Sequence, residues 1–186
     1  ALTAAGACAQ EEAPGALPRL TLEGPVTVSG LSSGAFFAHQ FHIAFSGVVE
    51  GAGIVAGGPY ACADDVPAAL WTNPARTIAT ALSVCTHAAR DTFDPLGVLL
   101  PEGPDADASL EAVREAWRDG GIDDPDAIAD DAVWLFHGGR DPVVPEEAME
   151  AVAGVYRGLG VSGGRLRMEE RGGAGHGFPV EGAVDS

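Results

Sequence analysis

The sequence lacks lysine, has little positive charge and contains no long hydrophobic run. All ten basic residues are arginines and face 27 acidic residues, which gives a formal net charge of −17. Such a field repels nucleic acid and anionic membrane surfaces, so we exclude both as partners. No apolar stretch approaches the roughly 20 residues of a membrane-spanning helix, which excludes a membrane span. The 186 residues, 46% of them hydrophobic, predict one globular domain, with no indication of its oligomeric state.

Cysteine is also scarce, and its spacing excludes several kinds of site. Three cysteines are present, Cys8, Cys62 and Cys85, and no C-x-x-C pair occurs. Zinc-binding and thioredoxin-like roles therefore have no support. His39 and His42 are three residues apart, but no carboxylate or cysteine lies near them, so we interpret them as packing or capping residues. We expect neither a metal nor another cofactor.

The N-terminal residues resemble the end of an export signal. Small residues at Ala7 and Ala9 precede a plausible cleavage point at Gln10. Cys8 as a lipid-attachment site and an ordinary alanine-rich tail are the alternatives. We expect a secreted or periplasmic protein, with a signal remnant and leader in residues 1–19 and a catalytic domain in residues 20–186. In an exported chain, Cys62 and Cys85 are predicted to form a disulfide, with two free thiols as the alternative.

From residue 25 onwards, hydrophobic patterns alternate between strand-like and helix-like segments. Alternation of this kind predicts an α/β fold with a mostly parallel sheet wrapped by helices. Trp117 and Trp134 lie in periodic or apolar runs, which predicts that both belong to the core. The predicted strands are residues 25–30, 51–58, 132–136 and 165–170; the predicted helices are 34–45, 108–119 and a segment that begins at Pro145 and ends near Gly158.

Gly30-Leu31-Ser32-Ser33-Gly34 fits the pattern G-x-S-x-G. It lies directly between a predicted strand and a predicted helix, which is the context of a nucleophile elbow. The helix N-terminus behind the serine supplies positive potential where an oxyanion would form. We therefore predict Ser32 as the nucleophile of an acyl-transfer reaction, and the backbone N–H of Ser33 as one oxyanion donor.

Partners for this serine follow in the order acid, then histidine. Asp141 comes shortly after the predicted strand 132–136, and His176 lies in a glycine-rich loop after the predicted strand 165–170. The carboxyl ends of parallel strands meet at one edge of a sheet, so all three side chains are expected there. The sequence thus predicts a Ser32–Asp141–His176 catalytic triad.

Two longer stretches carry a resemblance to a known family. The segment from Val28-Ser29-Gly30-Leu31-Ser32 to Cys62, together with the phrases around Asp141 and His176, resembles the secreted poly(3-hydroxybutyrate) depolymerases and related short-chain esterases. The resemblance covers roughly residues 25–63 and 120–180. It implies an α/β-hydrolase that cleaves polyester or oligoester bonds, with a circularly permuted order of elements.

The chain departs from that family in one respect. The resemblance to single-domain members of that family implies a second oxyanion donor from a segment well after the catalytic histidine, whereas this chain ends at Ser186. We therefore expect a C-terminally truncated hydrolase domain. A feruloyl or acetyl esterase acting on small or polysaccharide esters, and an inactive fold that acts as a binding module, are the alternatives.

Trp71 is predicted to line the substrate groove.

Overall fold

The computed structural model describes residues 23–64, 83–86 and 104–180. Four strands form one sheet in the order β1-β2-β3-β4, and every neighbouring pair is parallel. The strands are β1 (Val26–Leu31), β2 (Val49–Val55), β3 (Ala132–Gly138) and β4 (Leu166–Arg171). Because every neighbouring pair is parallel, the carboxyl ends of all four strands lie at the same edge.

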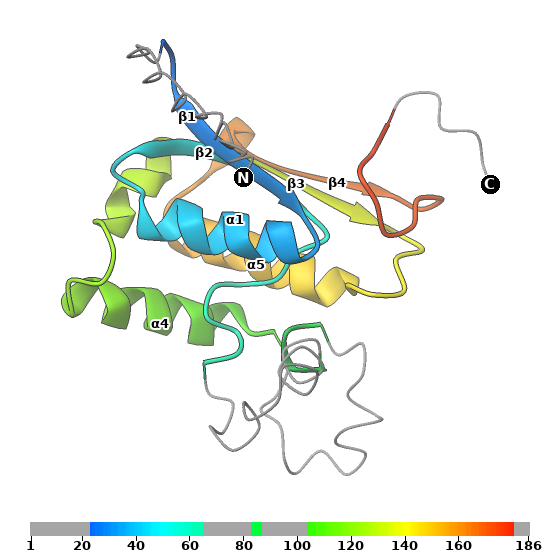
Figure 1. The fold of residues 1–186 in the computed structure, drawn as a ribbon, viewed down its shortest axis with the longest axis horizontal. Helices are drawn as coiled ribbons and strands as arrows, with labels where there is room; N and C mark the ends of the chain where they lie inside the picture. Colours follow the sequence, from blue (N-terminus) through cyan, green and yellow to red (C-terminus); the bar gives the residue numbers. More distant parts are fainter. Residues whose placement is uncertain (1–22, 65–82, 87–103, 181–186) are drawn as a thin grey trace, which may run out of the picture.

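The helices form two layers beside the sheet (Figure 1). Helices α1 (Ser33–Ala44) and α5 (Glu146–Gly158) connect neighbouring parallel strands and pack against the sheet. Right-handed crossovers between successive strands place both on the same face. Helix α4 (Ala106–Arg118) packs outside them, against α5. Two short 3-10 helices, η2 (Pro125–Asp130) and η3 (Gly163–Arg165), precede β3 and β4.

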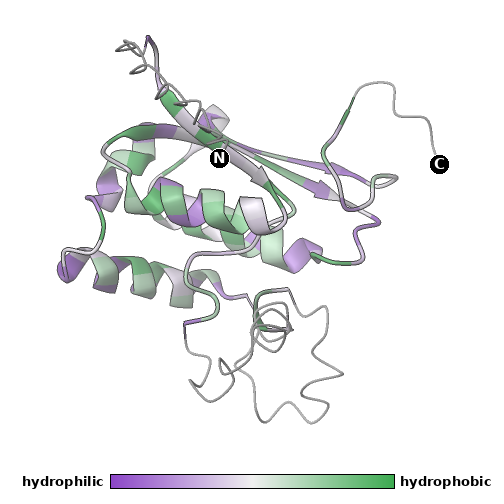
Figure 2. Ribbon diagram, viewed as in Figure 1, coloured by the Kyte–Doolittle hydropathy of each residue, from purple (hydrophilic) through white to green (hydrophobic). Residues whose placement is uncertain are grey.

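The core lies between the sheet and these two helices. Figure 2 shows hydrophobic residues along α1 and α5 and hydrophilic residues along β4 and in the first turn of α5. Alternate strand residues face the helices, as in the aligned pairs Ala52–Val133 and Ile54–Leu135. The fully buried side chains from α5 include Met149, Val152 and Tyr156.

A buried polar link joins α1 to α5 and to the start of β3. The His42 imidazole hydrogen-bonds the Tyr156 hydroxyl through Nδ1 and the Asp131 carboxylate through Nε2, both at 3.0 Å. Burial lowers the pKa of His42, although Asp131 acts in the opposite direction. Since each polar atom of this group has a partner, the link fixes α1 relative to the sheet without leaving an unpaired buried group.

The predicted alternation of strands and helices is confirmed, and the sheet is parallel. One detail of the sequence interpretation is wrong, the prediction that Trp117 belongs to the core. The Trp117 side chain is 45% exposed because it lies at the end of α4, beyond the contact with α5 made by Leu110 and Val113. Trp134 is half-buried and packs against the hydrophobic core, as predicted. It lies on the sheet face opposite to Val133 and Leu135, where it stacks on Phe136 with ring centroids 5.8 Å apart. Among the described residues, the helices that pack on the sheet lie on the face of Val133 and Leu135, opposite to Trp134.

No helix within the described ranges is long and apolar enough to cross a membrane.

Candidate active site

Ser32 occupies a sharp turn between the end of β1 and the start of α1. Its backbone has φ 56° and ψ −124°, a conformation that side-chain-bearing residues rarely adopt. Its N–H donates to the Val55 carbonyl at 3.0 Å, which ties the turn to the end of β2. A Cβ at Gly30 would lie 2.1 Å from the Gly34 carbonyl oxygen, so the turn requires glycine at position 30. A Cβ at Gly34 would contact nothing within 4 Å, so the second glycine of the motif is not needed for space.

Asp141 lies in a turn just beyond β3, and its carboxylate accepts three hydrogen bonds. Oδ1 accepts from the N–H groups of Val143 and Val144 at 2.8 and 3.0 Å. Oδ2 is 2.7 Å from His176 Nδ1. The Asp141 side chain is fully buried, whereas the His176 side chain is 21% exposed. The buried carboxylate therefore holds one imidazole nitrogen and leaves the other for chemistry.

These hydrogen bonds determine the protonation state of Asp141. Burial by itself raises the pKa of this carboxyl, because it disfavours the charged form. The hydrogen bonds from Val144, His176 and Val143 outweigh burial, so the pKa of Asp141 lies below its ordinary value. A carboxylate that stays ionised stabilises an imidazolium at His176 and fixes Nδ1 as the protonated nitrogen of the neutral ring.

The loop that carries His176 crosses the end of β3. Arg140 N–H donates to the Ala174 carbonyl at 2.9 Å, and Ala174 N–H donates to the Arg171 carbonyl at 3.0 Å. The loop passes so close to Gly138 that a Cβ there would lie 2.4 Å from the Gly175 carbonyl oxygen. Gly138 therefore allows the close approach that brings His176 to Asp141.

Ser32, Asp141 and His176 follow the carboxyl ends of β1, β3 and β4, respectively, and so belong to one edge of the sheet. No hydrogen bond links the Ser32 hydroxyl to His176, two residues that the structure describes. Such bonds are often long or absent without substrate and form when it binds. Ser33 is the first residue of α1, where a backbone N–H has no acceptor within the helix.

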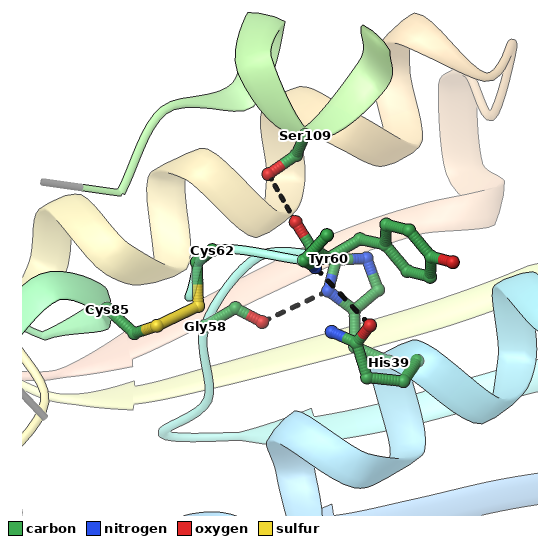
Figure 3. The surroundings of a disulfide bond; sticks show 8 residues. His39, Gly58, Tyr60, Cys62, Cys85 and Ser109 are labelled. Atoms are coloured by element: carbon green, nitrogen blue, oxygen red, sulfur yellow. Dashed lines mark hydrogen bonds between the residues drawn. A yellow bond between two sulfur atoms is a disulfide. The ribbon is translucent and has the colours of Figure 1, made fainter. Parts of the chain in front are cut away.

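A mainly apolar pocket of about 370 Å³ adjoins Ser32. The Cys62–Cys85 disulfide, with a Cα–Cα distance of 5.4 Å, forms part of its wall. Figure 3 shows this disulfide beside the segment that carries Gly58 and Tyr60. The lining residues are Ser32, Ser33, Phe36, Gln40, Ala61, Cys62, Ala63, Asp64, Cys85 and Val144.

Sequence comparison gives one curated relative that covers most of this chain. The chain is 33% identical over 143 residues to the poly(3-hydroxybutyrate) depolymerase of Delftia acidovorans; the match covers 75% of this chain and 24% of the relative. No protein-family model matches the chain.

Two solved structures with a similar fold are also poly(3-hydroxybutyrate) depolymerases. The depolymerase from Penicillium funiculosum aligns with a TM-score of 0.65 and 22% identity, over 87% of this chain and 43% of that one. A depolymerase complexed with an R3HB trimer aligns with a TM-score of 0.64 and 23% identity, over 87% of this chain and 42% of that one. The chain is a poly(3-hydroxybutyrate) depolymerase-like α/β-hydrolase. It spans about a quarter of the length of the curated relative.

The structure of this hydrolase adds pocket residues that the sequence analysis did not identify. Phe36 and Gln40 come from α1 and follow Ser32 at helical spacing, so the i+4 periodicity of the elbow helix was the signal that could have found them. Val144 lies next to the turn that holds Asp141. The predicted groove residue Trp71 lies outside the described residues. Within the described ranges, no cluster of three or more metal-ligating side chains is present.

Proposed function

We propose that this hydrolase is a serine esterase that cleaves poly(3-hydroxybutyrate) or short hydroxyalkanoate oligoesters through an acyl-enzyme, with Ser32, Asp141 and His176 as its triad. The observation that carries the proposal is the 2.7 Å contact between His176 and Asp141 at the sheet edge where the strained Ser32 turn faces a pocket. The relatives named as poly(3-hydroxybutyrate) depolymerases support the choice of substrate, as does the R3HB trimer bound in one of them.

The reaction begins when His176 Nε2 takes the proton of the Ser32 hydroxyl as its oxygen attacks the ester carbonyl carbon. The resulting oxyanion is stabilised by the Ser33 N–H at the positive end of α1. His176 then gives the proton to the departing hydroxyl oxygen as the ester bond breaks, leaving an acyl group on Ser32. Water, deprotonated by His176, releases the acyl group and restores the serine. Asp141 remains ionised throughout and stabilises the imidazolium.

We further propose that the protein acts outside the cytoplasm. The Cys62–Cys85 disulfide supports this location, because disulfides persist in oxidising compartments.

Hydrolysis of p-nitrophenyl butyrate by this chain, compared with its Ser32→Ala variant, tests the proposal. We expect p-nitrophenol release from the parent chain and a loss of about 10³-fold or more in the variant, since removal of a triad nucleophile leaves only residual rate enhancement. Circular dichroism of the variant should match that of the parent. Equal rates for the two proteins would refute the assignment of Ser32. Release of the R3HB trimer's hydrolysis products then distinguishes an oligoester hydrolase from a feruloyl or acetyl esterase.

A further inference from the structure

The peptide bond between Tyr60 and Ala61 is held at both ends by side chains from two helices. Ser109 Oγ of α4 donates to the Tyr60 carbonyl at 2.7 Å, as Figure 3 shows. The Ala61 N–H donates to Gln40 Oε1 of α1 at 3.3 Å. Ala61 itself has a φ of 53°, which is unfavourable for a residue with a Cβ. These two side chains therefore hold a strained segment of the pocket wall in place.

The contact with Ala61 also determines which way the Gln40 amide points. A backbone N–H can only donate, so the atom facing it must be the amide oxygen and the NH₂ group must lie on the other side. Gln40 lines the pocket, and no hydrogen-bond partner of its Nε2 is present among the described residues. The pocket thus contains an unused hydrogen-bond donor.

Few other groups of this pocket can donate. Among its described lining residues, the remaining donor side chains are the hydroxyls of Ser32 and Ser33, and the Ser32 oxygen is the proposed nucleophile. Phe36, Ala63 and Val144 contribute apolar surface. An amide donor in a mainly apolar pocket recognises an acceptor oxygen, and it is left unsatisfied when a wholly apolar chain fills the pocket.

The position of Gln40 indicates which substrate oxygen it meets. Gln40 lies eight residues after Ser32, so their Cα atoms are separated by ~12 Å along the helix axis, and helical side chains lean back towards the N-terminus. The amide is therefore displaced along α1 from the attacking Ser32 oxygen, and in a pocket that both residues line it can meet the repeat unit next to the scissile ester. That unit carries a carbonyl oxygen, whereas a fatty acyl chain has only methylene groups there.

We propose that Gln40 is a specificity-determining residue, which donates a hydrogen bond from Nε2 to the carbonyl oxygen of the second hydroxyacyl unit and so selects oligoesters over fatty acyl esters. This inference rests on the proposed esterase function. It adds to that function a residue that distinguishes two substrates of equal length.

The test compares two p-nitrophenyl esters, that of the 3-hydroxybutyrate dimer and the octanoate, whose acyl chains have the same number of main-chain atoms. Gln40→Glu keeps an oxygen for the Ala61 N–H and removes the donor; Gln40→Met removes both and preserves the length. We expect the ratio of kcat/KM for the dimer ester to that for the octanoate to fall about tenfold in both variants, the typical effect of one lost hydrogen bond. Ser109→Ala is the matched control, because it loosens the same peptide without touching the donor, and should leave the ratio unchanged.

Each outcome decides one question. An unchanged ratio in both Gln40 variants, or an equal fall in Ser109→Ala, would overturn the role of Gln40 while leaving the esterase intact. If the parent chain released p-nitrophenol from neither ester in a Ser32-dependent way, the proposed function would fail, and this inference with it.

Discussion

Burial decides the chemical state of His39, a residue of α1 about two turns after Ser32. Its side chain is fully buried, and Nδ1 lies 3.1 Å from the Gly58 carbonyl, to which it donates. Its Nε2 has no partner, and the ring packs against Tyr156 with centroids 4.9 Å apart. A protonated ring would place a charge in this apolar site, so burial lowers the pKa of His39 to about 4, partly offset by the bond to Gly58.

This shift predicts a loss of stability in mild acid. In the unfolded chain the histidine takes up a proton near pH 6.5, but in the folded chain only near pH 4, so the unfolding free energy falls as the pH drops through that window. Between pH 7 and 5, His39 alone should account for about 2 kcal/mol. His39→Asn keeps a donor for Gly58 and cannot titrate. Urea unfolding at both pH values should show a smaller loss in the variant; equal losses would contradict the assignment.

At the scale of elements, the site depends on how closely the loops after β3 and β4 approach each other. Glycine at position 138 lets the backbone at Ala174 and Gly175 cross the end of β3, and the Arg140–Ala174 hydrogen bond fixes that crossing. The loop that carries His176, the histidine loop, is therefore positioned by main-chain contacts as well as by the Asp141 carboxylate. Its placement is decided by the packing of two loops that are distant in sequence.

Gly138→Ala should disturb catalysis more than folding. The added methyl group would lie 2.4 Å from the Gly175 carbonyl oxygen, which must move and take the histidine loop with it. A displacement of about 1 Å at a catalytic group can cost about 100-fold in rate, so we expect kcat for p-nitrophenyl butyrate to fall by that order. Gly173→Ala is the control, because a Cβ there meets nothing within 4 Å. Similar kcat values for the two variants would show that the close approach is not critical.

At the scale of the whole molecule, the disulfide joins two positions in the chain between β2 and α4. Cys62 follows β2, and Cys85 is 23 residues further along. The bond lies in the wall of the pocket next to Ser32, so it links the stability of this region to the shape of the site.

The acidic excess acts on the same scale: a net charge of −17 favours solubility and opposes compaction.

Replacing both cysteines should lower global stability. Opening a loop of this length removes about 3 kcal/mol in the chain-entropy model. We expect the Cys62→Ala/Cys85→Ala double variant to unfold at lower urea concentration than the parent chain. Dithiothreitol should lower the midpoint of the parent and leave that of the variant unchanged. A parent protein insensitive to the reductant, with the variant equally stable, would argue against a structural role for this bond.

The order and type of the elements and three candidate catalytic residues could be predicted from the amino-acid sequence alone. The reason is local: the alternation of apolar residues specifies strands and helices, and the turns that carry Ser32, Asp141 and His176 follow their strands directly. The exposure of Trp117, the position of Gln40 in the pocket and the passage of the His176 loop close to Gly138 became apparent only from the folded protein. Those properties depend on which elements pack together, and local patterns do not encode contacts between residues far apart in the chain.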